Sequence, residues 1–371
     1  MKNLRLAIIL CLSAICLLFL LRVSPTKARV SLAVTPLSTQ VRAAVSDDGS
    51  PQKTKSPDRL TAKVSDFDGD GRADLALFVP PYNWFIRYSN SPPQLPCTWT
   101  PWVPLISTST FNLTGTTQIP VPGDYNHDSR TDLAVYEGFP ATGTTSSNYT
   151  LADSVTTPLV LFPPTVLTHN YGFTTDTPLM GDFNVGGDAD FTVVRALPSG
   201  ALEWYVQDSV PSYPYIINGT KWGIKDDYLV PGDYDGDGIT DMTIWRPSTG
   251  IWWTLTSSSV FTTILSATWG TNGDIPLLGD FDGDGKDDRA VFRPSTSTFY
   301  VMNSNGGLVA TVWGTSGDIP VPADYDRDGR TDVAVYRPVT GIWYPFPCAP
   351  QTFFGSCPAC IPVPSVYVKK T

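Results

Sequence analysis

The chain has 371 residues, of which 42% are hydrophobic and only 16% are charged. Its 30 glycines and 34 prolines exclude a coiled coil or a helical bundle, because those folds need charged helix formers and few prolines. The apolar content, with 11 tryptophans, is enough for a sizeable core and argues against a disordered chain. A net charge of −10 argues against a nucleic-acid partner, and two histidines leave little room for histidine-based catalysis or a zinc site.

The N-terminus predicts a secretory signal segment over residues 1–28. Lys2 and Arg5 precede an apolar stretch over residues 6–21, interrupted only by Ser13, and small and polar residues follow. This stretch is shorter than most membrane-spanning helices, although Arg22 directly behind it leaves an uncleaved signal anchor open. We therefore expect a secreted or cell-surface protein that touches the membrane only through this segment, and only if the segment is not cleaved.

Residues 29–58 are rich in Ser, Thr, Pro and Lys and predict a flexible linker before one repeat domain over residues 59–371. Four cysteines remain outside the signal segment: Cys97, Cys348, Cys357 and Cys360. In an oxidising compartment they predict two disulfides, one within the C-terminal tail and one linking Cys97 to it. Cys357 and Cys360 have redox or zinc-knuckle spacing, but no second pair matches it, which favours a structural disulfide.

An acidic segment of the type DFDGDGRAD recurs six times, beginning at Asp66, Asp124, Asp182, Asp233, Asp280 and Asp324. Each unit contains a Pro-containing strand, the acidic loop, a strand of the LAVY type, a turn and two further strands. Four short strands in about 50 residues are typical of a propeller blade. The sequence therefore predicts an all-β propeller of six four-stranded blades. A parallel β-solenoid is the rival fold, but its acidic repeats are much shorter.

Two segments can supply the strand that closes the ring. Residues 60–67 precede the first acidic loop, and residues 361–368 repeat the same type of strand near the C-terminus. The C-terminal strand either joins the first blade as a clasp, which we favour, or begins a seventh, incomplete blade.

The acidic loops carry the candidate chemistry. In the first loop, Asp66, Asp68, Asp70 and Asp74 place carboxylates at positions 1, 3, 5 and 9, and Arg72 at position 7 can offer its backbone carbonyl. Ca²⁺ prefers six to eight hard oxygen ligands, which one such loop can supply around a single ion. The pattern differs from an EF-hand, because position 12 is not Glu and the flanking segments are strands.

Three other loops repeat the full set: Asp233, Asp235, Asp237, Ile239 and Asp241; Asp280, Asp282, Asp284, Lys286 and Asp288; and Asp324, Asp326, Asp328, Arg330 and Asp332. The second loop keeps Asp124, Asn126, Asp128 and Asp132 but has Ser129 where Gly is expected. The third keeps Asp182, Asn184 and Asp190, with Gly186 in place of the central acid. Converging aspartates repel one another unless a cation neutralises them, so we expect about four to five Ca²⁺ ions. The alternative is a surface turn that Asp caps without metal.

These loops and the LAVY-type strands after them resemble the FG-GAP/VCBS repeat family, which includes the integrin α-subunit propeller and several fungal and bacterial lectins. The resemblance covers about residues 60–368. It implies a β-propeller with Ca²⁺ in the loop between the first two strands of each blade. It also implies a protein or glycan ligand outside the cell, although some family members are propellers attached to enzymes.

The longer units suggest where a ligand binds. Residues 82–102, 141–158 and 208–215 are insertions that we expect to lie away from the calcium loops, and binding residues concentrate on variable loops held by a rigid frame. The aromatic faces in the first insertion belong to Trp84, Trp99 and Trp102. Their alternative role is packing on the longer blades. Packing between blades is also expected for the Trp-Gly tryptophans, and pairing with an acid for Arg246, Arg293 and Arg337.

Together these features predict a non-catalytic, monomeric binding module for an extracellular protein or carbohydrate. The alternatives are a structural surface protein or a polysaccharide-cleaving enzyme. The chain has no Gly-x-Ser-x-Gly elbow and no Ser–His set, and calcium binding accounts for the paired acids. We therefore expect no enzyme activity.

Overall fold

A computed structural model of the chain describes residues 65–80, 83–89, 99, 103–106, 117–138, 147–152, 166–209, 216–352, 355–363 and 369–370. Contacts divide the chain into Met1–Gln52 and Lys53–Thr371, and all described residues belong to the second unit. The signal segment and the linker lie outside the described residues and stay predictions. None of the described helices is long and apolar enough to cross a membrane.

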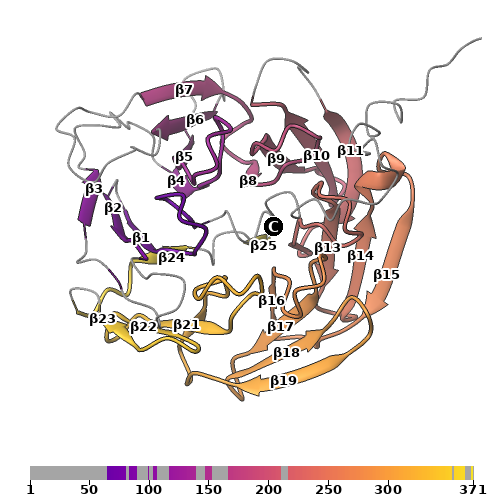
Figure 1. Ribbon diagram of the computed structural model, residues 1–371. Coiled ribbons are helices and arrows are strands. Elements are labelled where there is room, and N and C mark those ends of the chain that lie inside the picture. The colour runs from indigo at the N-terminus through magenta and orange to yellow at the C-terminus, as the bar shows by residue number, and fades with distance from the viewer. Residues whose placement is uncertain are drawn as a thin grey trace, which may run out of the picture. The chain divides into compact units, whose positions relative to one another are not determined.

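The described strands form six antiparallel sheets around a ring, which confirms the six-bladed propeller (Figure 1). From the inner strand outward, blade 1 contains β24 (Ile361–Val363), β1 (Leu75–Val79), β2 (Asn83–Arg87) and β3 (Val103–Ile106). Blade 2 contains β4 (Thr117–Pro120), β5 (Leu133–Gly138), β6 (Ser147–Ala152) and β7 (Val166–Asn170). Blade 3 contains β8 (Thr177–Leu179), β9 (Phe191–Ala196), β10 (Ala201–Gln207) and β11 (Ile217–Ile224).

The second half of the ring repeats the plan. Blade 4 contains β12 (Tyr228–Leu229), β13 (Met242–Arg246), β14 (Ile251–Leu255) and β15 (Ile264–Thr268), with a short 3₁₀ helix, η2 (Ser257–Ser259), after β14. Blade 5 contains β16 (Ile275–Leu277), β17 (Arg289–Arg293), β18 (Thr298–Met302) and β19 (Leu308–Val312). Blade 6 contains β20 (Ile319–Pro320), β21 (Ala334–Arg337), β22 (Ile342–Pro345) and β23 (Gln351–Thr352).

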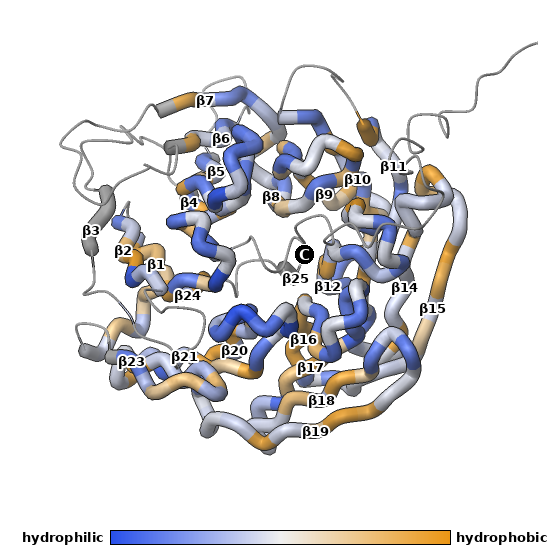
Figure 2. Tube along the Cα trace, in the orientation of Figure 1, coloured by the Kyte–Doolittle hydropathy of each residue, from blue (hydrophilic) through white to orange (hydrophobic). Residues whose placement is uncertain are grey.

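The core lies on the second strand of each blade. The middle residues of β1 and β17 are buried on both faces, because neighbouring blades cover the two sides of the sheet. The third strands β10 and β14 alternate buried and half-buried residues, and the outer strand β19 is mostly exposed. Burial thus decreases from the inside of the ring outward. Hydrophilic loops gather beside the inner strands (Figure 2).

The C-terminal strand closes the ring as a clasp. β24 pairs with β1 in antiparallel register, with Ile361 opposite Phe78 and Val363 opposite Ala76. It completes blade 1, so the described strands form no seventh blade. The next described residues, β25 (Lys369–Lys370), pair with β12 in blade 4, and Figure 1 shows the C-terminus inside the ring. This last pairing was not predicted from the sequence.

A closed circle of backbone hydrogen bonds joins the acidic loops. In each loop the amide at position 8 donates to the carbonyl of the position-1 aspartate in the preceding blade, at 2.5 to 2.8 Å. The six donor–acceptor pairs are Ala73–Asp324, Thr131–Asp66, Ala189–Asp124, Thr240–Asp182, Asp287–Asp233 and Thr331–Asp280. The pair Ala73–Asp324 links blade 6 to blade 1, so the acidic loops close the ring independently of the C-terminal strand.

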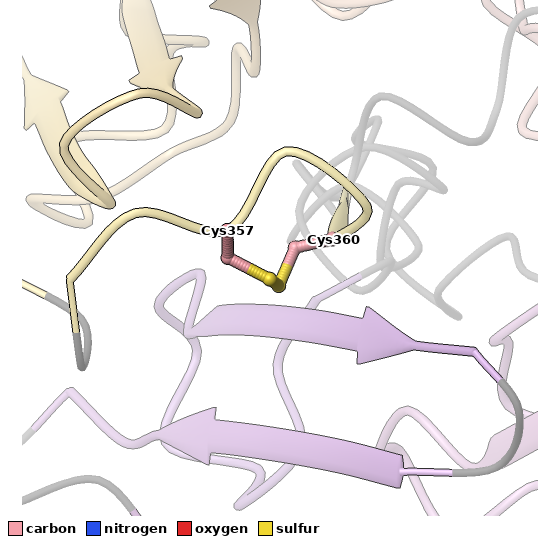
Figure 3. The surroundings of a disulfide bond; sticks show 2 residues. All are labelled: Cys357 and Cys360. Atoms are coloured by element: carbon pink, nitrogen blue, oxygen red, sulfur yellow. A yellow bond between two sulfur atoms is a disulfide. The ribbon is translucent and has the colours of Figure 1, made fainter.

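The tail contains the predicted disulfide, Cys357–Cys360 (Figure 3). Cys348 is also disulfide-bonded, and its partner lies outside the described residues, because the other two described cysteines bond each other. Cys97 lies outside the described residues as well. Its link to the tail stays a prediction.

Candidate metal centres

The six acidic loops lie at one rim of the ring. Each loop from blade 2 to blade 6 connects the inner strand of its blade to the second strand, and the first loop leads directly into β1. Since all inner strands run in the same sense, their ends meet at the same rim. The other ends of these strands form the opposite rim, which we call the arginine rim because arginines of the second strands lie there.

Left-handed backbone at positions 4 and 6 shapes the loops. In the first loop Gly69 and Gly71 have φ of 77° and 85°, and their amides donate to the two oxygens of Asp66 at 2.7 and 2.8 Å. The fourth, fifth and sixth loops repeat both hydrogen bonds on their first aspartate. Glycine adopts this backbone at no steric cost, which explains the Gly-rich pattern. Ser129 in the second loop adopts it too, with φ of 67°.

Carboxylates converge in the four loops that carry the full aspartate set. In each of them three carboxylates offer oxygens within 4.8 Å of one another: Asp66, Asp68 and Asp70; Asp233, Asp235 and Asp241; Asp280, Asp282 and Asp288; and Asp324, Asp326 and Asp332. Hard, anionic oxygens at this separation are the ligand set that Ca²⁺ prefers. The residues present therefore fit a calcium ion in each of these four loops.

Burial and mutual repulsion raise the pKa values of these carboxyl groups. Desolvation and the negative charges of Asp68 and Asp70 raise the pKa of Asp66 to about 7. The backbone N–H groups that bond Asp66 lower its pKa, but by less. Burial likewise raises the pKa of Asp241 to about 7 and that of Asp332 to about 8. The pKa values of Asp68, Asp233, Asp288 and Asp324 rise to about 6, again mainly through burial. Such carboxyl groups take up protons near neutral pH unless a cation holds them ionised.

Serines from the connection between the third and fourth strands cover the acidic loops. The Ser89 amide donates to Asp74 at 2.7 Å, and its hydroxyl donates to Asp70 at 2.9 Å. The Ser257 amide donates to Asp241 at 2.7 Å, and its hydroxyl donates to Asp237 at 3.0 Å. The Ser304 amide makes the same contact with the last loop aspartate of blade 5. Sequence reasoning missed these serines, although each follows the last aspartate of its own loop by 15 or 16 residues.

The second and third loops differ at position 3, where both have Asn. The Nδ2 of Asn126 donates to Asp132 at 3.4 Å, and the Nδ2 of Asn184 donates to Asp190 at 3.1 Å. An amide N–H therefore faces the last aspartate where the other loops have a carboxylate. The third loop also lacks the left-handed backbone at position 4, held by Val185. Neither loop forms one of the carboxylate clusters found among the described residues.

The three predicted arginines pair with acids at the arginine rim. Arg246 bonds both oxygens of Asp227, and Arg293 and Arg337 do the same with Asp274 and Asp318, at 2.7 to 2.9 Å. The guanidinium groups also lie over Trp253, Tyr300 and Tyr344. Sequence reasoning missed a fourth such pair, Arg195 with Asp176. In all four pairs the acid precedes the arginine by 19 residues.

The tryptophans pack between and within blades. Trp84 is fully buried against Phe78 and Phe67, so it has no face open to a ligand, contrary to the predicted contact. Trp99 is partly buried, and its ring meets the edge of Tyr325 in blade 6. Trp102 lies outside the described residues. The Trp-Gly tryptophans Trp269 and Trp313 donate their indole N–H to the backbone carbonyls of Tyr300 and Tyr344 in the next blade, at 3.1 and 2.8 Å.

The position of the inserted loops also differs from the expectation. The β2–β3, β6–β7 and β10–β11 connections begin at the rim of the acidic loops, because the third strand of a blade runs parallel to the inner one. Ser89 at the start of the β2–β3 connection and Ser209 after β10 bond directly to loop aspartates, Asp74 and Asp188. The connections after the third strands therefore share a rim with the acidic loops. The predicted insertion 141–158 instead contains the strand β6, and its residues before β6 belong to the β5–β6 connection, which begins at the arginine rim.

Comparison with known proteins agrees with this architecture. Residues 280–335, from the fifth acidic loop into β21, match the family of FG-GAP-like repeats. The protein is a six-bladed β-propeller with an FG-GAP-like repeat. None of the curated proteins matches the sequence.

Two solved structures are similar to this propeller at low sequence identity. One is described as the specific recognition of non-reducing terminal N-acetylglucosamine by an Agrocybe aegerita lectin. It has a TM-score of 0.46 and 13% identity, over 80% of this chain and 96% of that one. The other is BBS1N in complex with ARL6DN, soaked with lead, with a TM-score of 0.33 and 12% identity, over 73% of this chain and 78% of that one.

Proposed function

We propose that the protein is a calcium-stabilised, non-catalytic binding module that takes a protein or carbohydrate ligand outside the cell. The observation that carries the calcium part is the convergence of carboxylates in four loops of one rim. Structural aspartates at the arginine rim have a guanidinium partner, whereas the clustered aspartates repel one another. A divalent cation in each loop removes this repulsion.

The ligands of each ion come from one loop. In the fourth loop these are Asp233, Asp235, Asp237 and Asp241, with the backbone carbonyl of Ile239, which lies 3.4 Å from the Ser257 hydroxyl. The first, fifth and sixth loops offer the equivalent sets. The second loop, with Asn126 at position 3, is the candidate for a fifth and weaker ion.

Calcium and ligand binding are linked through the shared rim. The long connection of blade 1 starts from Ser89, which bonds Asp74 and Asp70, so an ion that fixes these aspartates also fixes the base of this connection. Variable loops on a rigid frame are where binding residues concentrate. We therefore place the ligand on the acidic-loop rim, over the connections of blades 1 to 3, with Trp99 and Trp102 as aromatic contacts.

A glycan array and a pull-down from extracellular material, each run with millimolar Ca²⁺ and with chelator, test this proposal. We expect a ligand that binds in Ca²⁺ and is lost when Trp99 and Trp102 are both replaced by Ala. Trp253→Ala, in blade 4 and therefore outside the proposed ligand surface, is the control and should retain binding. Absence of any ligand in both screens would favour a structural surface protein. Binding that persists in chelator would contradict the link to calcium.

A further inference from the structure

Four blades begin with the same turn at the arginine rim. In blade 5 the Asp274 amide donates to the Thr271 carbonyl three residues earlier, and the Asp274 carboxylate accepts the Thr271 amide at 2.9 Å. The inner strand β16 begins at the next residue, Ile275. The same turn leads into β8, β12 and β20, with Asp176, Asp227 and Asp318 in the place of Asp274.

An arginine of the second strand locks each of these turns. Arg293 lies five residues after the last loop aspartate, Asp288, and bonds both oxygens of Asp274. Arg195, Arg246 and Arg337 occupy the same position in blades 3, 4 and 6. The aspartates are nearly fully buried, with 0 to 2% of the side chain exposed. The inner strands of these four blades are therefore held by an ion pair.

The turn that leads into the ring-closing strand makes the same backbone hydrogen bond but has different side chains. The Cys360 amide donates to the Cys357 carbonyl at 3.1 Å, and β24 begins at the next residue, Ile361. Cys360 thus takes the position of the aspartate. The arginine position in blade 1, five residues after Asp74, is Val79. No ion pair between these two positions is possible here, and the disulfide joins the ends of the turn instead, with both side chains on the same side (Figure 3).

The disulfide lies at the joint between blades 6 and 1. Cys360 is buried in a cluster that includes Leu77 of blade 1 and Trp343 of blade 6. The Cys357 amide donates to the Pro338 carbonyl in the β21–β22 turn at 2.9 Å. Cys357 is the more exposed of the two cysteines, and the residues between them, Pro358 and Ala359, are exposed. A thiol from solution therefore approaches from the Cys357 side.

We propose that Cys357–Cys360 is a thiol-exchangeable latch that replaces the aspartate–arginine lock at the closure of the ring. A thiolate of a dithiol reductant attacks the Cys357 sulfur and forms a mixed disulfide, while the Cys360 thiolate leaves and takes up a proton. The second thiol of the reductant then attacks its own sulfur in the mixed disulfide. Cys357 is released as a thiol, and the reductant leaves as a cyclic disulfide. Two electrons and two protons pass from the dithiol to the protein.

Opening the latch frees the turn before β24, a strand of only three residues. The closing strand then loses its lock, whereas the inner strands of blades 3 to 6 keep ion pairs that thiols do not attack. The circle of hydrogen bonds between the acidic loops also remains. Reduction therefore loosens one joint of the propeller and leaves the rest of the ring folded.

Graded dithiothreitol on the full chain in Ca²⁺, followed by alkylation with mass mapping and hydrogen exchange, tests the latch. We expect Cys357 and Cys360 to be alkylated before Cys348. Exchange in peptides covering β24 and β1 should accelerate by about tenfold, the change produced by a loss of about 1.4 kcal/mol of local stability. Peptides covering β16 and β17, locked by Asp274 and Arg293, are the internal control and should not change. Unchanged exchange in β24 after complete alkylation of Cys357 and Cys360 would overturn the proposal.

A variant in which an aspartate–arginine pair replaces the disulfide tests the same proposal independently. Cys357→Thr, Cys360→Asp and Val79→Arg together install the three side chains of the blade 5 lock at the closure. We expect exchange in β24 of this variant to be indifferent to dithiothreitol, whereas Cys357→Ser with Cys360→Ser should show fast exchange with and without the reductant. Slow exchange in the double-serine variant would mean that the disulfide does not hold the strand, and would also overturn the latch.

Discussion

The two rims of the propeller use the same residue in opposite ways. At the arginine rim, Asp227 and Asp274 are buried and each bonds a guanidinium group of its own chain. At the acidic-loop rim, Asp241 is buried and Asp332 half-buried beside other carboxylates, and desolvation raises their pKa values to about 7 and about 8. A buried carboxylate needs a positive partner. At the arginine rim the chain itself supplies that partner, and at the acidic-loop rim we propose that a cation from solution does.

The largest loss of stability is expected where the arginine partner of a buried aspartate is removed. Arg246→Met removes the guanidinium partner of the buried Asp227 carboxylate, so we expect a loss of about 3 kcal/mol of unfolding free energy. The loss should be the same in Ca²⁺ and in chelator, as measured by chemical denaturation. Arg246→Met with Asp227→Asn, which removes the stranded charge, should recover part of it. A loss that appears only in Ca²⁺ would mean that the two rims are not independent.

At the acidic-loop rim, calcium should decide whether removal of an aspartate destabilises the fold. Asp237→Asn removes one charge from the fourth loop, so without Ca²⁺ the variant should melt at the same temperature as the parent or above it. With Ca²⁺ the variant should lose up to about 2.7 kcal/mol, the stabilisation given by an ion present at 100 times its dissociation constant. Asp226→Asn, at an exposed aspartate of the same blade, is the control. Equal destabilisation in both conditions would argue for a purely structural Asp237.

The stability of the calcium-free protein should depend on pH, because burial raises the pKa values of the loop aspartates. Burial raises the pKa values of Asp66, Asp241 and Asp332 in the fold to between about 7 and about 8, above the ordinary value of 3.8. The folded state therefore binds more protons than the unfolded state, and stability falls as pH rises from about 4 to about 8. Melting temperatures of protein freed of calcium by dialysis should decrease over this range. The gain from added Ca²⁺ should grow over the same range, because protons compete for the ligands at low pH. A calcium-free protein that is more stable at pH 8 than at pH 5 would contradict this.

The smallest effect concerns the backbone of the second loop. Ser129 has φ of 67°, a conformation that costs an L-residue about 1 kcal/mol relative to glycine. Ser129→Gly should therefore raise the unfolding free energy by up to about 1 kcal/mol. Gly238→Ser, at the equivalent position of the fourth loop with φ of 88°, is the reciprocal change and should lower it by a similar amount. A lower melting temperature for Ser129→Gly, or a higher one for Gly238→Ser, would show that the strain lies elsewhere.

The sequence predicts the blades because local pattern and repeat spacing decide them. Each acidic loop needs left-handed backbone and closely spaced carboxylates, and each strand after it is short and apolar, so both are visible in a window of about ten residues. The closing strand is visible for the same reason, since residues 361–363 repeat the inner-strand type. The arginine pairing was expected, although the acid partner 19 residues earlier was not.

Features that depend on strand direction and on packing across blades were missed. Trp84 sits in an aromatic-rich insertion, but the alternation of β2 turns it into the core. The long connections share a rim with the metal loops because the first and third strands of a blade are parallel to each other, which the sequence shows only once the strands are bounded. The pairing of β25 with β12 joins segments far apart in the chain and has no local signal.

Calorimetric titration of the calcium-free protein with Ca²⁺ at pH 8 tests the central claim most directly. Four converged clusters predict about four bound ions, or five if the second loop also binds, together with a higher melting temperature in the saturated protein. Asp237→Asn should weaken or remove one of these ions and leave the others. A protein that takes up no Ca²⁺ at pH 8 and melts identically in chelator would contradict the account.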